Sequence, residues 1–246
     1  MTRTSPHPRP HPRPRPRTAL IFLATALLAC SGDKTRTADA TPAATAKQAN
    51  GTAAPASGQG QDTISRLADR GRILGDSSAQ VWVVMASDFQ CPYCKQWHDA
   101  AFAGLVRDYV NTHKVRMAFL NMPLSIHQHA KPASEAAMCA AVQDKFWEMH
   151  DSLFATQKIW EVLESPLSMF DTLANHNHVE MMAWRACMSN HSTAALIDAD
   201  LDRARQTGAN STPSFFVGSM KLAGADANVR GAIDSALKAA AAKPKR

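Results

Sequence analysis

Two cysteines, Cys91 and Cys94, are separated by two residues in the run SDFQCPYCKQWH. Such a pair can serve a structural zinc site, a permanent disulfide or a redox-active dithiol. Zinc needs four ligands, but the sequence has no second C-x-x-C pair, and His98 is more typical of a helix surface. A permanent disulfide would stabilise little because the loop it closes is so short. The pattern therefore favours redox chemistry that uses no metal and no other cofactor.

The residues around this pair predict where the two thiols lie. Residues 81–85 form an apolar, β-rich run typical of a buried central strand, and apolar residues recur at helical spacing after Cys94. Cys91 therefore begins a helix, where unpaired backbone N–H groups and the helix dipole stabilise a thiolate. Pro92 suits this first turn because it lacks an N–H. We expect Cys91, the more exposed thiol, to react with substrates and Cys94 to resolve the mixed disulfide.

The remaining elements follow in a definite order. Residues 114–122 predict a second strand, which Pro123 ends. Helical patterns occupy about 124–208, and a strand hairpin around Gly218 and a closing helix come after them. The order strand, helix, strand, helical block, hairpin, helix predicts one α/β domain over residues 62–246.

The runs DFQCPYC and STPSFFVG, with the helical block between them, resemble the DsbA-like branch of the thioredoxin superfamily, the exported thiol–disulfide oxidoreductases. The resemblance covers about residues 72–240 and implies a thioredoxin fold with an all-helical insertion. It also implies a cis peptide bond between Thr212 and Pro213, beside the cysteines; X-Pro is the dipeptide for which cis costs little. The backbone of Thr212 would then pair with an extended substrate segment. Glutaredoxins share the dipeptide Pro92-Tyr93, but they lack an export signal and the helical insertion.

The resemblance is incomplete at two positions. Members of this branch commonly have a buried glutamate six residues before the first cysteine, where this chain has Met85. Asp88 is the nearest acid, but strand alternation places residues 85 and 88 on opposite faces, so we expect water to carry the proton of the inner thiol. Strongly oxidising DsbA has histidine where this chain has Tyr93, which is neutral at physiological pH. We therefore expect a reduction potential between those of strong oxidants and reductants.

Cys139 and Cys187 both lie in the helical block. Buried cysteines often act only as small apolar residues, which is one interpretation of this pair. Their even number in an oxidising compartment, and the second disulfide that some relatives carry, favour a Cys139–Cys187 bridge. The histidine runs at 126–129 and 176–178 are expected to face solvent in loops rather than to bind a metal.

The N-terminus is typical of an export signal. An arginine-rich start is followed by the apolar run 19–29, too short to span a bilayer as a helix, which predicts a signal peptide over residues 1–29. Its end, LLAC, resembles the lipobox of bacterial lipoproteins, so Cys30 is the expected lipidation site and Ser31 suggests outer-membrane sorting. Cleavage by ordinary signal peptidase is the alternative. Residues 30–61, rich in Ala, Thr, Ser, Gly and Pro, predict a flexible, lipidated tether.

The net charge of +6 comes almost entirely from five arginines before residue 31, so we expect no nucleic-acid partner. The prediction is a monomeric envelope enzyme, lipid-anchored to the membrane and facing the periplasm. It exchanges disulfides with exported cysteine-containing proteins, as an oxidase, and depends on a redox partner that the sequence does not identify. An isomerase or reductase would use the same chemistry. A binding or chaperone module of the same fold, with inert cysteines, is the alternative from a different class.

Overall fold

A computed structural model of the chain describes residues 57–242. The predicted signal peptide, the lipidation site Cys30 and most of the predicted tether lie outside the described residues. The tether was expected to continue to residue 61, but helix α1 (Ser57–Gly71) already includes its last residues. Within the described part of the chain, no helix is both long and apolar enough to cross a membrane.

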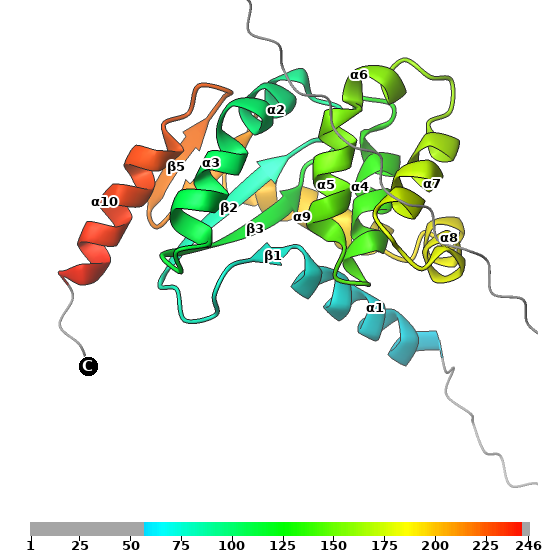
Figure 1. The fold of residues 1–246 in the computed structure, drawn as a ribbon, viewed down its shortest axis with the longest axis horizontal. Helices are drawn as coiled ribbons and strands as arrows, with labels where there is room; N and C mark the ends of the chain where they lie inside the picture. The colour runs from blue at the N-terminus through cyan, green and yellow to red at the C-terminus, as the bar shows by residue number, and fades with distance from the viewer. Residues whose placement is uncertain (1–56, 243–246) are drawn as a thin grey trace, which may run out of the picture. The chain divides into compact units, whose positions relative to one another are not determined.

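One mixed sheet of five strands organises the fold, in the order β1-β3-β2-β4-β5 (Figure 1). The central strand β2 (Val81–Ser87) pairs in parallel with β3 (Val115–Asn121) and antiparallel with β4 (Ser214–Val217). The short strands β1 (Ile73–Leu74) and β5 (Met220–Ala223) form the two edges. Because β2 and β3 are parallel, the loops that follow them leave the same end of the sheet. That end carries the two cysteines of the C-x-x-C pair.

A helical stretch follows the cysteine pair directly. It starts with α2 (Pro92–Trp97), continues through a π-helical segment η1 (His98–Phe102) and α3 (Ala103–Leu105), and ends in a second π-helical segment η2 (Val106–Val110). The stretch packs on one face of the sheet, which the closing helix α10 (Val229–Ala241) also covers, and its buried side chains belong to the main apolar core.

The chain inserts a block of helices between β3 and β4. Its members are α4 (Ala130–Ala141), α5 (Phe146–Ala155), α6 (Gln157–Trp160), α7 (Leu167–His176), α8 (Met181–Ser189) and α9 (Ala194–Gln206). The almost wholly buried, alanine-rich α4 lies at the centre and packs against α5, α7, α8 and α9, while α9 returns to β3. Figure 1 shows this block beside the sheet and next to α2. The predicted α/β fold with a helical insertion is confirmed.

Two buried links connect distant parts of this fold. Cys139 in α4 and Cys187 in α8 form a disulfide, with an S–S distance of 1.99 Å. The guanidinium of Arg72, just before β1, contacts the carboxylate of Asp200 in α9, and the same carboxylate accepts a 2.8 Å hydrogen bond from the Asn121 side chain at the end of β3. Arg72, Asn121 and Asp200 are all buried, so this ion pair joins one edge of the sheet to the insertion.

Candidate active site

Cys91 is the last residue before α2 and caps its N-terminus. Its backbone is extended, with φ −69° and ψ 124°, and Pro92 is the first helical residue. The N–H of Cys91 donates to the carbonyl of Asp88 over 3.1 Å, and its own carbonyl accepts from the N–H of Lys95 over 3.2 Å. This geometry points the Cys91 sulfur at the free N–H groups of the first helical turn, a position that favours a thiolate.

The two thiols of the pair differ sharply in acidity. A hydrogen bond from the Cys94 thiol is the largest cause that lowers the pKa of Cys91, to about 6, and Thr212 and the N–H groups of Cys94 and Tyr93 act in the same direction, against burial. Burial raises the pKa of Cys94 well above its ordinary value of 9.0, and the interaction with Cys91 raises it further. Cys91 is therefore largely a thiolate at neutral pH, while Cys94 stays protonated.

Exposure does not separate the two thiols in the way that the sequence suggested. Cys91 is 3% exposed and Cys94 is 1% exposed, so both residues are buried. The Cys94 sulfur accepts a hydrogen bond from the N–H of Asp88 over 3.5 Å. Hydrogen bonds that lower the pKa of Cys91 and burial that raises the pKa of Cys94 therefore distinguish the two thiols, although neither is exposed.

The loop before β4 meets the sulfur from the other side. The peptide bond between Thr212 and Pro213 is cis, and the carbonyl oxygen of Thr212 lies 3.6 Å from the sulfur of Cys91. The fold therefore brings together two segments that are 121 residues apart in the chain.

The comparison with known proteins agrees with this geometry. A family model described as thioredoxin matches residues 68–235, more than half of the chain. The chain belongs to the thioredoxin family. Its sequence is DsbA-like: disulfide bond formation protein D of Bacillus subtilis is similar to it, with 24% identity over 170 residues that cover 65% of this chain and 73% of that protein.

A second type of relative is a much larger protein. The Na(+)/H(+) antiporter NhaA 3 of Salinispora tropica is 36% identical over 150 residues, which cover 61% of this chain and 22% of the antiporter. The NhaA 1 antiporter of Salinispora arenicola is 35% identical with the same coverage. This DsbA-like chain thus spans about a fifth of the length of these two curated relatives.

Solved structures show the same fold. Oxidised BdbD of Bacillus subtilis superposes with a TM-score of 0.62 at 23% identity, covering 69% of this chain and 94% of that one. The α-DsbA1 protein of Wolbachia pipientis also gives a TM-score of 0.62, at 20% identity, covering 69% and 92%. The insertion of helices into a thioredoxin fold is therefore shared with DsbA proteins.

The position of the missing glutamate is filled by an apolar side chain in this DsbA-like protein. Met85 lies in β2 and is buried. Asp88 lies beyond the end of β2, so strand alternation does not describe its direction, contrary to our sequence argument. Its buried carboxylate accepts hydrogen bonds from the N–H groups of Gln90 (2.7 Å) and Leu124 (2.9 Å) and lies 2.7 Å from Nδ1 of His127. These contacts join the loop before Cys91 to the loop after β3.

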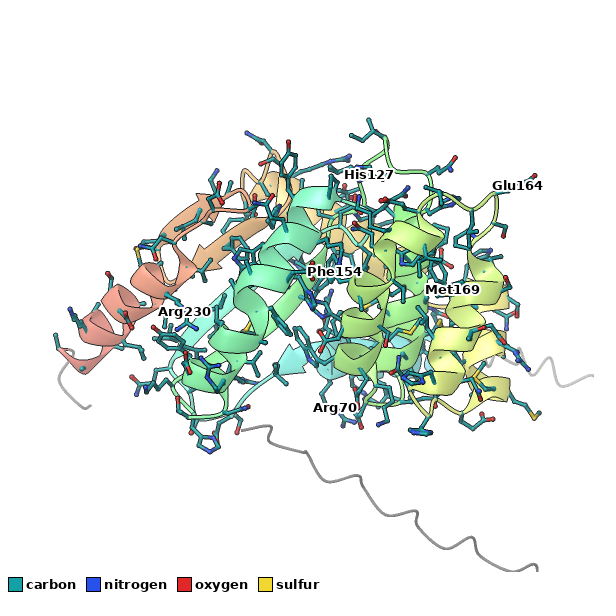
Figure 2. The ribbon with its side chains drawn as sticks, turned by 45° about the horizontal axis from the view of Figure 1, so that its top comes forward. Arg70, His127, Phe154, Glu164, Met169 and Arg230 are labelled. Atoms are coloured by element: carbon teal, nitrogen blue, oxygen red, sulfur yellow. A yellow bond between two sulfur atoms is a disulfide. The ribbon has the colours of Figure 1, made fainter. Side chains whose placement is uncertain are left out.

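Two histidines expected to face solvent have structural contacts instead. His127, which is labelled in Figure 2, is half-buried beside Asp88. His129 is buried; its ring contacts the carbonyl of Leu163 at 2.8 Å, and its N–H donates to the side chain of Gln90 over 2.7 Å. The expectation for residues 126–129 was therefore wrong at these two positions. His176 and His178 are exposed, in agreement with the sequence argument.

Several contacts between the insertion and the active-site helix were not predicted. The side-chain amide of Gln157, the first residue of α6, donates to the carbonyls of Phe89 (2.6 Å) and Cys91 (3.1 Å). The ammonium of Lys95 donates to the carbonyl of Phe154 over 2.8 Å, and Figure 2 labels Phe154 between the active-site helix and the insertion. No local sequence pattern indicates these contacts, because a glutamine or lysine in a helix is ordinary.

One cluster near the site combines residue types that bind metals. Nε2 of His98 and Nδ1 of His150 lie 3.1 and 2.8 Å from the same carboxylate oxygen of Asp151. Burial lowers the pKa of His150 to about 4, so its ring is neutral at physiological pH. Both distances are those of ordinary hydrogen bonds, so the cluster is explained as a hydrogen-bonded link between η1 and α5.

Proposed function

We propose that this DsbA-like protein oxidises exported, cysteine-containing proteins in the bacterial cell envelope, with Cys91 and Cys94 as its redox pair. The observation that supports this most directly is the opposed acidity of the two thiols beside a cis Thr212–Pro213 bond. A low pKa stabilises the reduced form of the site and makes Cys91 a good leaving group, and both effects favour donation of the disulfide.

The proposed reaction begins with a disulfide between Cys91 and Cys94. A substrate thiolate attacks the sulfur of Cys91; the bond to Cys94 breaks, and Cys94 leaves as a thiolate that takes up a proton. A second thiolate of the substrate then attacks the substrate sulfur of the mixed disulfide, and Cys91 is released as a thiolate. The substrate loses two electrons and the site gains them. A redox partner must then reoxidise the site.

The surroundings of the site suit an unfolded polypeptide. The Tyr93 side chain between the cysteines is 61% exposed. Ile126 lies in the loop that Asp88 and Gln90 hold, and Ile159 and Val162 lie in or just after α6, whose first residue contacts Cys91; all three are exposed. Apolar segments of an unfolded chain would contact these side chains while an extended stretch pairs with Thr212.

The acidity of Cys91 supports a reduction potential between that of the strongest oxidant and that of the reductant thioredoxin. Its pKa of about 6 lies above the value of about 3.5 for the strongest oxidant and below the value of about 7 for thioredoxin. An isomerase or reductase remains the alternative within the same chemistry. Equilibration with glutathione buffers gives the potential, and a value as oxidising as that of DsbA would contradict the proposal.

We also propose that the protein is a monomer attached to the membrane by a lipid on Cys30, with the segment before α1 as a tether. The support is the sequence LLAC and the composition of residues 31–56. Mass spectrometry of the mature N-terminus tests the anchor, since an unmodified Cys30 would exclude it.

The decisive experiment for the function measures oxidation of a reduced, unfolded substrate by the oxidised protein. We expect stoichiometric disulfide transfer by the wild type and none by Cys91→Ser. Cys94→Ser cannot form the disulfide and should donate none, but its Cys91 thiolate should be trapped as a mixed disulfide when it attacks a substrate that already carries a disulfide. Transfer that is equally fast without Cys91 would reject the enzyme and favour a binding module. In cells, a mostly oxidised Cys91–Cys94 pair is expected, and a mostly reduced pair would indicate a reductase or isomerase.

A further inference from the structure

Gln157 makes an unusual contact for a residue so far from the cysteine pair in sequence. Its side chain is completely buried, and its amide nitrogen donates to two carbonyl oxygens, those of Phe89 and Cys91. Because both partners can only accept hydrogen bonds, the atom between them must be the amide nitrogen and not the amide oxygen. The amide oxygen is buried without a hydrogen-bond partner. The side chain therefore supplies hydrogen bonds to the two carbonyls, while its own amide oxygen goes without one.

The two carbonyls that Gln157 binds bracket the turn into the reactive residue. Phe89 precedes Cys91 by two residues, and the carbonyl of Cys91 also accepts the first hydrogen bond of α2, from the N–H of Lys95. Fixing both carbonyls fixes the backbone on each side of residue 90 and so the direction of the Cys91 sulfur. A carbonyl oxygen carries partial negative charge, and an N–H group bound to it reduces the unfavourable potential at a nearby thiolate.

The insertion can fix the backbone around Cys91 because it also contacts the helical stretch that follows Cys91. Lys95 donates to the carbonyl of Phe154 at the end of α5, and His98 contacts Asp151 in the same helix. Gln157 follows α5 directly, after Thr156, so its backbone is held by the helix that these two contacts attach to the helical stretch after Cys91. The insertion therefore contacts both the helical stretch after Cys91 and the loop before it.

We propose that Gln157 is a positioning residue through which the helical insertion sets the acidity of Cys91. The proposal rests on the proposed function, since Cys91 is there the attacked sulfur. Gln157 touches neither substrate nor the reacting sulfur; it acts through the backbone of Phe89 and Cys91. A methionine of similar volume at this position keeps the packing but removes both N–H donors.

The test compares the alkylation rate of Cys91 as a function of pH in the wild-type chain and in Gln157→Met. Loss of the two neutral hydrogen bonds is expected to raise the pKa of Cys91 by about one unit. At pH 6, where about half of Cys91 is thiolate in the wild type, the alkylation rate should then fall about fivefold. The equilibrium constant with glutathione should shift towards the oxidised protein.

Gln143 provides a matched control in the same insertion. Its side chain also bridges backbone groups, accepting from the N–H of Glu180 (2.7 Å) and donating to its carbonyl (3.2 Å), but it makes no contact with the loop before α2. Gln143→Met should lower the melting temperature and leave the pH profile of Cys91 unchanged. A purely structural role for Gln157 would make the two variants behave alike.

The outcomes are distinguishable. A folded Gln157→Met protein with the wild-type pH profile, or an equal shift in Gln143→Met, would overturn the proposal. If Gln157→Met does not fold, Gln157→Glu preserves the size of the side chain; its ionised carboxylate cannot donate, and it should raise the Cys91 pKa further, so an unchanged profile in that variant also overturns it. Loss of disulfide transfer in the wild type would instead reject the proposed function.

Discussion

The lowered pKa of Cys91 predicts that the reduced protein becomes more stable as the pH rises. An unfolded chain has a cysteine pKa near 9.0, and the folded value is about 6. A depressed pKa contributes stability in full above the unfolded value, and the contribution disappears as the pH falls through the folded value. The effect should therefore develop between about pH 6 and pH 9. The raised pKa of Cys94 acts only above this window.

The size of the effect follows from the two pKa values. Between pH 5 and pH 8 the linkage relation gives about 2–3 kcal/mol of additional free energy of unfolding for the reduced form. Screening by nearby solvent lowers this to about 1–2 kcal/mol. For a domain of this size the melting temperature should rise by roughly 2–8 °C over the same range.

The assay is thermal unfolding of the reduced protein from pH 5 to pH 8, with the Cys139–Cys187 disulfide kept intact and checked by thiol counting. Cys91→Ser is the control, because it retains every other titrating group. Among these is His150, whose lowered pKa also makes stability fall as the pH drops below 6.5. The prediction concerns the difference between the two proteins. Equal pH dependence in wild type and Cys91→Ser would refute the reasoning.

Three further predictions concern other parts of the structure. Replacing both Cys139 and Cys187 by serine opens a loop of 48 residues, which should lower the free energy of unfolding by about 4 kcal/mol in urea titrations; a change well under 1 kcal/mol would show that the bridge adds no stability. Asp200→Asn leaves the buried guanidinium of Arg72 without its main counter-charge and should cost about 3 kcal/mol, whereas an unchanged denaturation midpoint would mean that Asp69 suffices. Tyr93→His should lower the Cys91 pKa and make the protein more oxidising against glutathione, and an unchanged equilibrium constant would argue against side-chain control at this position.

Local patterns in the sequence were sufficient for much of the fold. The apolar run that became β2, the helix after Cys94 and five helices of the insertion all have periodicities that a short window contains. The two-residue strand β1 and the four-residue helix α6 do not, because neither is long enough to show a period. Both are held by tertiary contacts: β1 by pairing with β3, and α6 by the contacts of Gln157 with the loop before α2.

The candidate site was only partly accessible from the sequence for a similar reason. Cys91 and Cys94 lie within one motif, so their spacing was sufficient to identify the pair. Contacts that depend on the closing of the fold, such as Asp88 with His127 or Arg72 with Asp200, join residues 39 and 128 positions apart. A single sequence contains no signal for such pairs, and the assignment of His127 to solvent was wrong because its partner could not be foreseen.

The contacts of Asp88 limit how a proton can reach Cys94. When Cys94 leaves as a thiolate in a buried site, it needs a proton, and burial makes the charged form costly. Met85 cannot supply one. The carboxylate oxygens of Asp88 already accept from two backbone N–H groups and contact His127, so they face away from a role at the Cys94 sulfur. The proton must then arrive from the solvent side, through water or from the incoming substrate thiol. Adding a carboxylate by Met85→Glu should therefore change the pH dependence of the step in which Cys94 leaves, measured as formation of the mixed disulfide, while an unchanged profile would show that position 85 lies outside the proton route.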